Sequence, residues 1–399
     1  MLVRIIFFTA ILFANISQAV AQQPQCTSLL SQFSEDSLMR FVYELVGRKT
    51  VAINGQNTTI ASRQYLHPGN RLAEAYLKET FKRFNFTVSM DTFSMTGVNV
   101  LAYKQGTEFP NKAILLCAHF DNVGNATSPF EGADDNASGT AALLETARLL
   151  QNVPTAYSII LAAWDEEEQG LIGSRAWAPA GSGAVEPVAV INMDMIAYDN
   201  NNDSLLMLHV VPQIPSTLLL AQRIVELNTI YQTQLNPFIR NPGDPGSDHQ
   251  AFWITGSNAI GYSEDYTAVD FNPHWHLFSD SVYYFNLPYY YKMAKLASVS
   301  VCDLASTGKL TSLNKPVQSN KNRLLFNNPV SDHIWVSTQN NDGLLKLDFI
   351  DMKGTSIWKT EVEENNPTAI PAYLPNGIYI MKVQSEAHTF VARIFIQRP

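Results

Sequence analysis

The chain is poor in cysteine and in positive charge. Three of its 399 residues are Cys, so at most one disulfide bond can form within it. Lys and Arg number 27 against 36 Asp and Glu, which gives a net charge of −9. Binding of nucleic acid needs a basic surface that neutralises phosphates, so we expect no nucleic-acid partner.

The sequence also lacks an apolar run long enough for a membrane span. The apolar run at residues 5–15 falls short of the ~20 residues that a span needs, so we expect no stable membrane span. This run follows Arg4 and precedes Ala19-Val20-Ala21, a small-x-small cleavage pattern. The pattern favours a signal peptide at residues 1–21 over a membrane anchor. It predicts a protein that is secreted or held at the cell surface.

Three common catalytic motifs are missing as well. The sequence contains no His-Glu-x-x-His, no Gly-x-Ser-x-Gly and no Walker loop. This argues against the corresponding metalloproteases, α/β-hydrolases and P-loop NTPases. A serine hydrolase built from Ser247 and His249 is therefore disfavoured, and we interpret Ser247-Asp248-His249 as a helix start with structural polar contacts, although a substrate-facing role stays open.

The cysteines that are present allow one specific pairing. Export permits disulfide bonds, and Cys26 and Cys302 lie near the two ends of the larger predicted domain. They could tie its ends together, but sequence spacing alone leaves the pairing open. Cys117 lies in a predicted buried strand and is expected to be a core thiol.

Strands alternate with helices over the first 300 residues. This alternation predicts an α/β domain at residues 22–303, with a doubly wound, mostly parallel sheet flanked by helices. The expected strands are 86–93, 98–103, 113–118, 157–164, 188–193 and 258–262, and the expected helices are 36–46, 70–84, 138–151, 216–231, 248–255 and 287–301.

The composition changes after this domain. Residues 304–322 are polar, rich in Ser, Asn and Lys, and predict a linker. Short alternating segments follow, separated by turns that contain Asn and Gly. They predict a small all-β sandwich at residues 323–399, with strands at 333–338, 344–351, 355–360, 377–384 and 388–396.

Metal-binding side chains follow several of the predicted strands in the larger domain. The carboxyl ends of parallel strands meet at one sheet edge, where open α/β sheets place their sites. Histidine nitrogens and carboxylate oxygens are ligands that zinc prefers. Together they predict a two-metal peptidase site at that edge, formed by His119, Asp135, Glu168, Asp194 and His276.

Each of these residues alone has an ordinary structural explanation. A His after a strand is usually structural, and an Asp before Ser-Gly is usually a helix cap. Asp165 and Glu166 are expected to form a solvated acidic turn. Asp194, within the apolar run VAVINMDMI, is harder to explain, because a buried carboxylate is unfavourable unless it is paired or bound to metal.

Two further carboxylates are placed to support the histidines. Asp121 comes two residues after His119, and Asp280 comes four residues after His276. Ligating histidines usually donate their second ring N–H to a carboxylate or a carbonyl. We therefore expect Asp121 and Asp280 to orient the two imidazoles.

Five segments carry a resemblance to a known family. In order, AHFD, GADDNASG, EEQGLIGS, NMDM and NPHWH make residues 65–300 similar to the secreted co-catalytic zinc aminopeptidases of metallopeptidase family 28, of the bacterial leucyl aminopeptidase type. The resemblance implies a zinc exopeptidase fold and two Zn²⁺ ions. It also implies, as substrates, peptides with a free N-terminus.

The same resemblance assigns roles to single residues. It implies that His119 and Asp194 hold one zinc, that Glu168 and His276 hold the other, and that Asp135 bridges them. Glu167 is the implied general base. The register of GADDNASG selects Asp135 over Asp134, and that of EEEQGLIGS selects Glu167 and Glu168 over Glu166.

Two other functions stay open. Trp275, directly before His276, also resembles the related glutaminyl cyclases, which share the fold. A non-catalytic metal-binding or adhesion protein is the second alternative, which the presence of Glu167 disfavours. Four aromatic residues are expected either to line a side-chain pocket or to belong to the core: Trp253, Tyr262, Tyr266 and Phe271.

The tail carries a second resemblance. NNPVSDHIWV, LKLDFIDMKGTSIW and LPNGIYIMKV are similar to the C-terminal sorting domain of type IX secretion cargo. The resemblance implies that secretion machinery is a partner of this domain. A generic carbohydrate- or protein-binding β-sandwich is the alternative.

Overall fold

The computed structural model describes residues 23–178, 185–267 and 270–307, and parts of the chain between 325 and 398. Those parts are 325–326, 333–334, 336–337, 344–351, 355–363, 366–385, 389–396 and 398. The predicted signal peptide and residues 308–322 of the predicted linker lie outside the described residues. The chain divides into two units, Met1–Leu313 and Asn314–Pro399, which are treated separately below.

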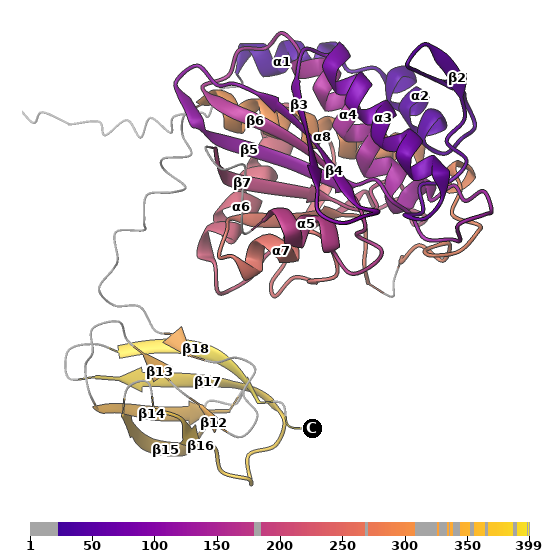
Figure 1. The fold of residues 1–399 in the computed structure, drawn as a ribbon. Helices are drawn as coiled ribbons and strands as arrows, with labels where there is room; N and C mark the ends of the chain where they lie inside the picture. Colours follow the sequence, from indigo (N-terminus) through magenta and orange to yellow (C-terminus); the bar gives the residue numbers. More distant parts are fainter. Residues whose placement is uncertain are drawn as a thin grey trace, which may run out of the picture. The chain divides into compact units, whose positions relative to one another are not determined.

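An eight-stranded sheet runs through the first unit (Figure 1). Its order is β3-β4-β6-β5-β7-β10-β8-β9, and the neighbours from β6 to β10 are all parallel. The strands are β3 (Thr87–Thr92), β4 (Val98–Lys104), β5 (Phe109–His119), β6 (Tyr157–Trp164), β7 (Glu186–Met193), β8 (Leu205–His209), β9 (Asn236–Arg240) and β10 (Ala259–Ser263).

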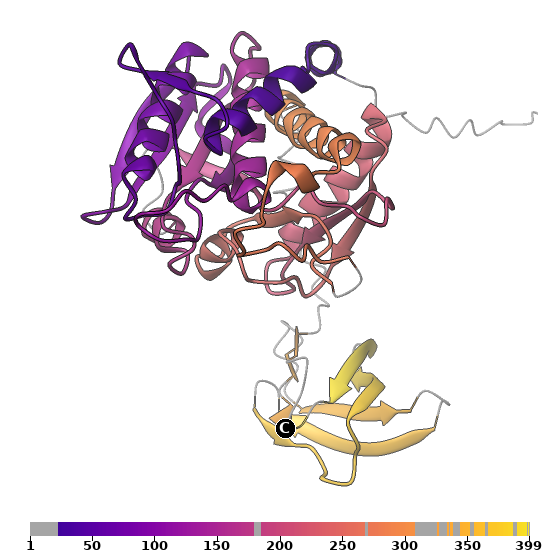
Figure 2. The ribbon, with the colours of Figure 1, turned by 90° about the vertical axis from the view of Figure 1, so that its right-hand side faces the viewer.

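Helices cover both faces of this sheet, as the two views show (Figures 1 and 2). Alternate residues of β6 divide between two apolar clusters, with Leu161 in one and Trp164 in the other. This confirms the predicted doubly wound, mostly parallel α/β class. The helices are α1 (Pro24–Ser31), α2 (Glu35–Leu45), α3 (Pro68–Arg83), α4 (Gly139–Leu150), α5 (Ile172–Trp177), α6 (Pro215–Tyr231), α7 (His249–Ile254) and α8 (Leu287–Thr307).

Several short elements were not predicted from the sequence. Strands β8 and β9 extend the sheet beyond β10, and the hairpin of β1 (Val51–Ile53) and β2 (Gln56–Thr58) precedes α3. Helix α8 continues to Thr307, past the predicted domain end at 303, because Leu304 and Ala305 are buried in the core. A π-helical turn, η1 (Ala133–Ser138), leads into α4, and a short 3-10 turn, η2 (Val282–Tyr284), precedes α8.

A disulfide bond joins Cys26 of α1 to Cys302 of α8, so the pairing that the sequence left open does form. It connects residues 276 positions apart near the two ends of the first unit. Cys117 is a free, buried thiol on β5, as predicted. Among the described helices, none is both long and apolar enough to cross a membrane.

The second unit is all-β, as predicted. A four-stranded antiparallel sheet has the order β15-β14-β17-β18 and packs one face on an apolar cluster that includes Leu347, Phe349 and Met381. Two smaller sheets pair β11 with β13 and β12 with β16. The strands are β11 (Leu325–Phe326), β12 (His333–Ile334), β13 (Val336–Ser337), β14 (Leu344–Ile350), β15 (Ser356–Glu363), β16 (Thr368–Ala369), β17 (Gly377–Gln384) and β18 (Thr389–Ile396).

Candidate metal centre

The five predicted ligands meet at the carboxyl edge of the parallel strands. His119 is the last residue of β5, Asp194 directly follows β7, and Glu168 lies in the turn after β6. Asp135 lies in η1 before α4, and His276 lies in the loop between β10 and α8. The fold therefore brings together residues that are up to 157 positions apart, between His119 and His276, at the edge where such sheets place their sites.

Asp135 lies between the two histidines. Its Oδ1 is 3.2 Å from His119 Nε2, and its Oδ2 is 3.3 Å from His276 Nε2. Asp194 Oδ1 lies 3.3 Å from the same nitrogen of His119, and Glu168 Oε2 lies 3.0 Å from that of His276. The site thus has two halves that share a single carboxylate.

These donors fit a pair of metal ions. His119, Asp135 and Asp194 offer ligand atoms within 4.8 Å of one another, and so do Asp135, Glu168 and His276. The buried Oε1 of Glu168 has no hydrogen-bond partner among the described residues. A mixed set of imidazole nitrogens and carboxylate oxygens, with more negative than positive charge, suits zinc.

Burial and contacts set the protonation of these groups. Burial raises the pKa of Asp135, but hydrogen bonds from His119 and His276 outweigh it and hold that pKa well below its ordinary value. Burial raises the pKa of Glu168 to about 8 and that of Glu167 well above its usual range. Burial lowers the pKa of His276, yet hydrogen bonds to Asp135 and Glu168 raise it to about 10.

Asp121 contacts His119, as expected, and also holds the backbone of Glu167 and Glu168. Its Oδ1 lies 3.4 Å from His119 Nδ1. Its two oxygens also accept hydrogen bonds from the backbone N–H groups of Glu167 and Glu168, at 3.1 and 3.2 Å. One buried carboxylate therefore fixes both the imidazole and the turn that carries the two glutamates.

Asp280 has a different partner from the one expected. It accepts hydrogen bonds from the backbone N–H groups of Asp134 and Asp135, at 2.9 and 3.1 Å. Among the described residues no hydrogen bond joins it to His276. His276 itself has a left-handed backbone, with φ of 58°, and Asp280 holds the Asp135 turn instead.

The predicted solvated turn at Asp165 and Glu166 is wrong, since both side chains are buried. Asp165 accepts hydrogen bonds from Asn70 and from the backbone of Val98. Glu166 accepts one from Thr96 Oγ1 at 2.6 Å. Their partners lie about 70 to 95 positions away in sequence, so the local acidic pattern gave no sign of them.

Arg63 is a further residue of the site that sequence reasoning missed. Its side chain is fully buried, and it donates to the carbonyl oxygens of Phe120, Glu131, Gly132 and Leu45, at 2.6 to 2.9 Å. It thereby joins the loop after His119 to the turn before Asp135. Burial lowers the pKa of Arg63 to about 10, and the nearby carboxylates, Asp280 foremost, oppose that shift.

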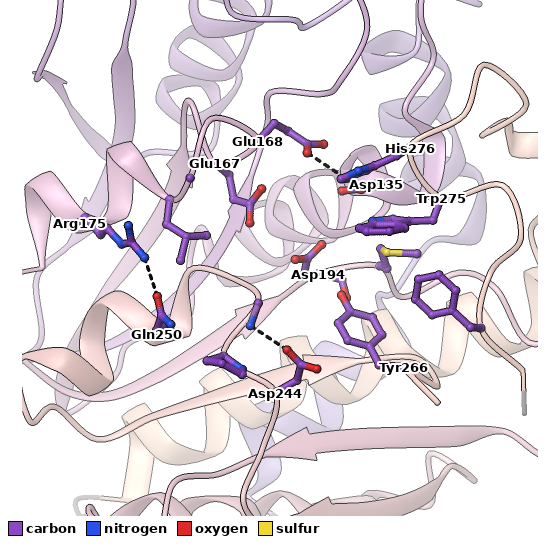
Figure 3. Close-up of a pocket in the computed structure, with 16 residues that line it drawn as sticks. Asp135, Glu167, Glu168, Arg175, Asp194, Asp244, Gln250, Tyr266, Trp275 and His276 are labelled. Carbon is purple, nitrogen blue, oxygen red and sulfur yellow. Dashed lines mark hydrogen bonds and ion pairs between the residues drawn. The ribbon is translucent and has the colours of Figure 1, made fainter. Parts of the chain in front are cut away.

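A pocket of about 610 Å³ opens over this centre (Figure 3). Tyr266 and Phe271 line it, together with Trp275. Trp253 and Tyr262 do not belong to the lining. They donate to the carbonyls of Ala259 and Met293, respectively. Of the four aromatic residues that the sequence singled out, two therefore line the pocket and two do not.

The Ser247-Asp248-His249 segment lies outside the lining, at the start of α7. His249 Nε2 donates to the carbonyl of Asp244 at 2.7 Å, and Ser247 Oγ accepts from Asn192 at 2.8 Å. Both contacts are structural, in line with the predicted helix start.

Part of this chain is similar in sequence to known metalloproteases. A probable zinc metalloprotease of Pyrenophora teres f. teres is 30% identical over 185 residues, which are 40% of this chain and 37% of that protein. The aligned region is thus well under half of that relative's length.

Solved structures share the fold. The LapA aminopeptidase of Legionella pneumophila superposes with a TM-score of 0.60 at 19% identity, covering 71% of this chain and 75% of that one. The glutaminyl cyclase of Porphyromonas gingivalis superposes with a TM-score of 0.56 at 20% identity, covering 68% of this chain and 99% of that one.

Two family matches account for both units. Residues 324–397 match the secretion system C-terminal sorting domain. Residues 99–301, half of the chain, match peptidase family M28, and they contain all five residues at the shared Asp135 site. This protein therefore belongs to peptidase family M28 and carries a C-terminal secretion sorting domain.

Proposed function

We propose that the protein is an exported zinc aminopeptidase that removes single residues from peptides with a free N-terminus. The observation that carries the proposal is the position of Asp135, whose two oxygens face His119 and His276 separately. His119 and Asp194 would hold one zinc ion, Glu168 and His276 the other, and Asp135 would bridge them. Two zinc ions there would acidify a water molecule and polarise the scissile carbonyl.

Glu167 is suited to move the proton. It lines the pocket, and its Oε2 is 4.0 Å from His119 Nε2. Its carboxylate also lies within 4.8 Å of ligand atoms of His119 and Glu168, so it is next to the proposed metal site. Burial raises the pKa of its carboxyl, which favours its holding a proton between steps. Glu167 would accept the proton of the attacking water and return it to the leaving amine.

A second candidate is a glutaminyl cyclase. The indole of Trp275 stacks on the His276 imidazole, with ring centroids 3.9 Å apart, and forms a flat wall beside the proposed metal site. Such a wall would suit the planar amide of an N-terminal Gln. The α-amine of that Gln would then attack its own side-chain amide carbon, forming a ring C–N bond as the bond to ammonia breaks.

Mass spectrometry of peptides incubated with the zinc-loaded protein separates these functions. The set contains a Leu-initiated peptide, its N-acetylated form and a Gln-initiated peptide. Stepwise loss of Leu from the free peptide only supports the aminopeptidase, and loss of ammonia from the Gln peptide alone supports the cyclase. If no peptide changes although metal is bound, both catalytic proposals fail in favour of a binding protein.

The family match of the second unit supports export. We propose that residues 1–21 are a signal peptide, that the enzyme domain ends with α8 at Thr307 and is followed by a linker, and that the domain at 323–399 directs the protein to secretion machinery. Deletion of residues 323–399 in a producing bacterium with that machinery tests this. The deleted form should accumulate inside the cell envelope, whereas equal release of both forms would contradict the proposal.

A further inference from the structure

The pocket has two unlike halves on either side of the proposed metal site. Figure 3 shows Trp275 and Tyr266 on one side, and Arg175 with Gln250 on the other, with Glu167 between Arg175 and the ligands. Phe271 packs edge-on against both Tyr266 and Trp275 and adds apolar surface to the first half. The pocket therefore offers an aromatic wall at one end and a cationic group at the other.

The guanidinium of Arg175 is held by a neutral amide and not by a carboxylate. Its side chain extends from the last turn of α5, and its Nη2 donates to the neutral Oε1 of Gln250 at 2.7 Å. Within the described part of the chain, no carboxylate lies within ion-pair distance of it. Asp244 also lines the pocket, and its Oδ1 accepts the backbone N–H of Gly246 at 2.9 Å. Gln250 thus orients the guanidinium and leaves its remaining donors available.

The position of Glu167 gives the direction of a bound peptide. The group that returns a proton to the leaving amine must lie beside that amine, within hydrogen-bond reach. The leaving part of the peptide therefore lies on the Glu167 side, toward Arg175. The side chain of the first residue is left with the half that Trp275, Tyr266 and Phe271 form.

We propose that Arg175 binds a carboxylate of the leaving part of the substrate, so that the enzyme favours short peptides with an acidic group just beyond the scissile bond. This inference rests on the proposed aminopeptidase function. A planar guanidinium binds a carboxylate through two parallel hydrogen bonds, which a neutral amide cannot match. The carboxylate belongs either to the C-terminus of a dipeptide or to an Asp or Glu side chain, and a pocket of about 610 Å³ has room for either.

The test compares matched substrates on the zinc-loaded full chain. Leu-Gly and Leu-Gly-amide differ in the terminal carboxylate, and Leu-Glu-amide and Leu-Gln-amide differ in the side-chain carboxylate. Leu-p-nitroanilide carries neither and reports the basal activity. Each is measured on the wild-type protein, on Arg175→Met and Arg175→Lys, and on Arg71→Met, which removes an exposed arginine of α3 that pairs with Glu74 outside the pocket.

We expect Arg175→Met to lower kcat/KM about 10-fold or more for at least one carboxylate substrate, mainly through KM, while its neutral partner changes less than about 3-fold. Arg175→Lys should retain part of the preference, and Arg71→Met all of it. The pair that responds identifies the source of the carboxylate.

Two results would overturn the inference while leaving the aminopeptidase intact. One is cleavage of Leu-p-nitroanilide with no difference between charged and neutral partners in the wild type. The other is an equal loss on all substrates in Arg175→Met, which would mean a structural role. If Leu-p-nitroanilide and all four peptides are left uncleaved by the wild type, the proposed function itself fails.

Discussion

Asp280 Oδ2 accepts a hydrogen bond from the backbone N–H of Asp135 at 3.1 Å, and both residues are buried. Asp280 thereby fixes the direction of the carboxylate that lies between the two histidines. A side chain that holds a ligand's backbone in this way acts on metal affinity without touching the metal.

Asp280→Asn should therefore weaken zinc binding. Asn keeps one acceptor oxygen and turns an amide toward the second backbone N–H, so the Asp135 turn loses a hydrogen bond. We expect zinc affinity to fall about 10- to 100-fold, measured by competition with a chromophoric chelator. Asp270→Asn is the matched control, because Asp270 also accepts two backbone N–H groups, from Asn200 and Asn201, at a surface loop. Equal affinities in both variants would refute this role.

Arg63→Lys should destabilise the protein more than a surface change does. A lysine amine cannot reach the four carbonyls that the guanidinium contacts, so buried acceptors are left unpaired. The expected loss is about 3 kcal/mol in the free energy of unfolding, measured by urea denaturation. Arg71→Lys, at an exposed pair with Glu74, should change it by less than about 0.5 kcal/mol. Similar losses in the two variants would show that the buried contacts of Arg63 contribute little to the free energy of unfolding.

Glu167→Gln should abolish turnover and leave metal content unchanged. The amide cannot accept the proton of the attacking water, so kcat should fall about 10²- to 10⁴-fold. Metal analysis of the same sample checks that the site is filled. Glu166→Gln is the neighbouring control, since that carboxylate contacts Thr96 and not the pocket. Full activity in Glu167→Gln would exclude Glu167 as the base.

Zinc uptake by the metal-free protein should release protons. The pKa of His276 is raised to about 10, so its imidazole is protonated at neutral pH, and the raised pKa of Glu168, about 8, adds a second proton. Zinc binds the deprotonated groups, so its affinity should rise with pH up to about 10, and most steeply below about 8, where both groups carry a proton. Calorimetry in buffers of different ionisation enthalpy counts the protons. A pH-independent affinity with no proton release would contradict these protonation states.

The sequence predicted the sheet edge well because apolar runs mark the strands, and the residues that follow parallel strands lie together at one edge of the sheet. His119 and Asp194 could be placed at that edge from this rule alone. Arg63 could not, since its partners are main-chain carbonyls, which leave no pattern in the sequence. The burial of Asp165 was hidden for a related reason: its partners Asn70 and Val98 come from distant elements. Strands β8 and β9, five residues each, were also missed.

The central claim is that Asp135 bridges two metal ions, and anomalous diffraction from crystals of the zinc-loaded protein tests it most directly. The account predicts two peaks at the zinc edge, one on each side of the Asp135 carboxylate. One should lie about 2.0–2.2 Å from ligand atoms of His119 and Asp194, and the other as close to those of Glu168 and His276. A single peak, or two peaks of which only one touches Asp135, would contradict the two-zinc site on which the proposed aminopeptidase rests.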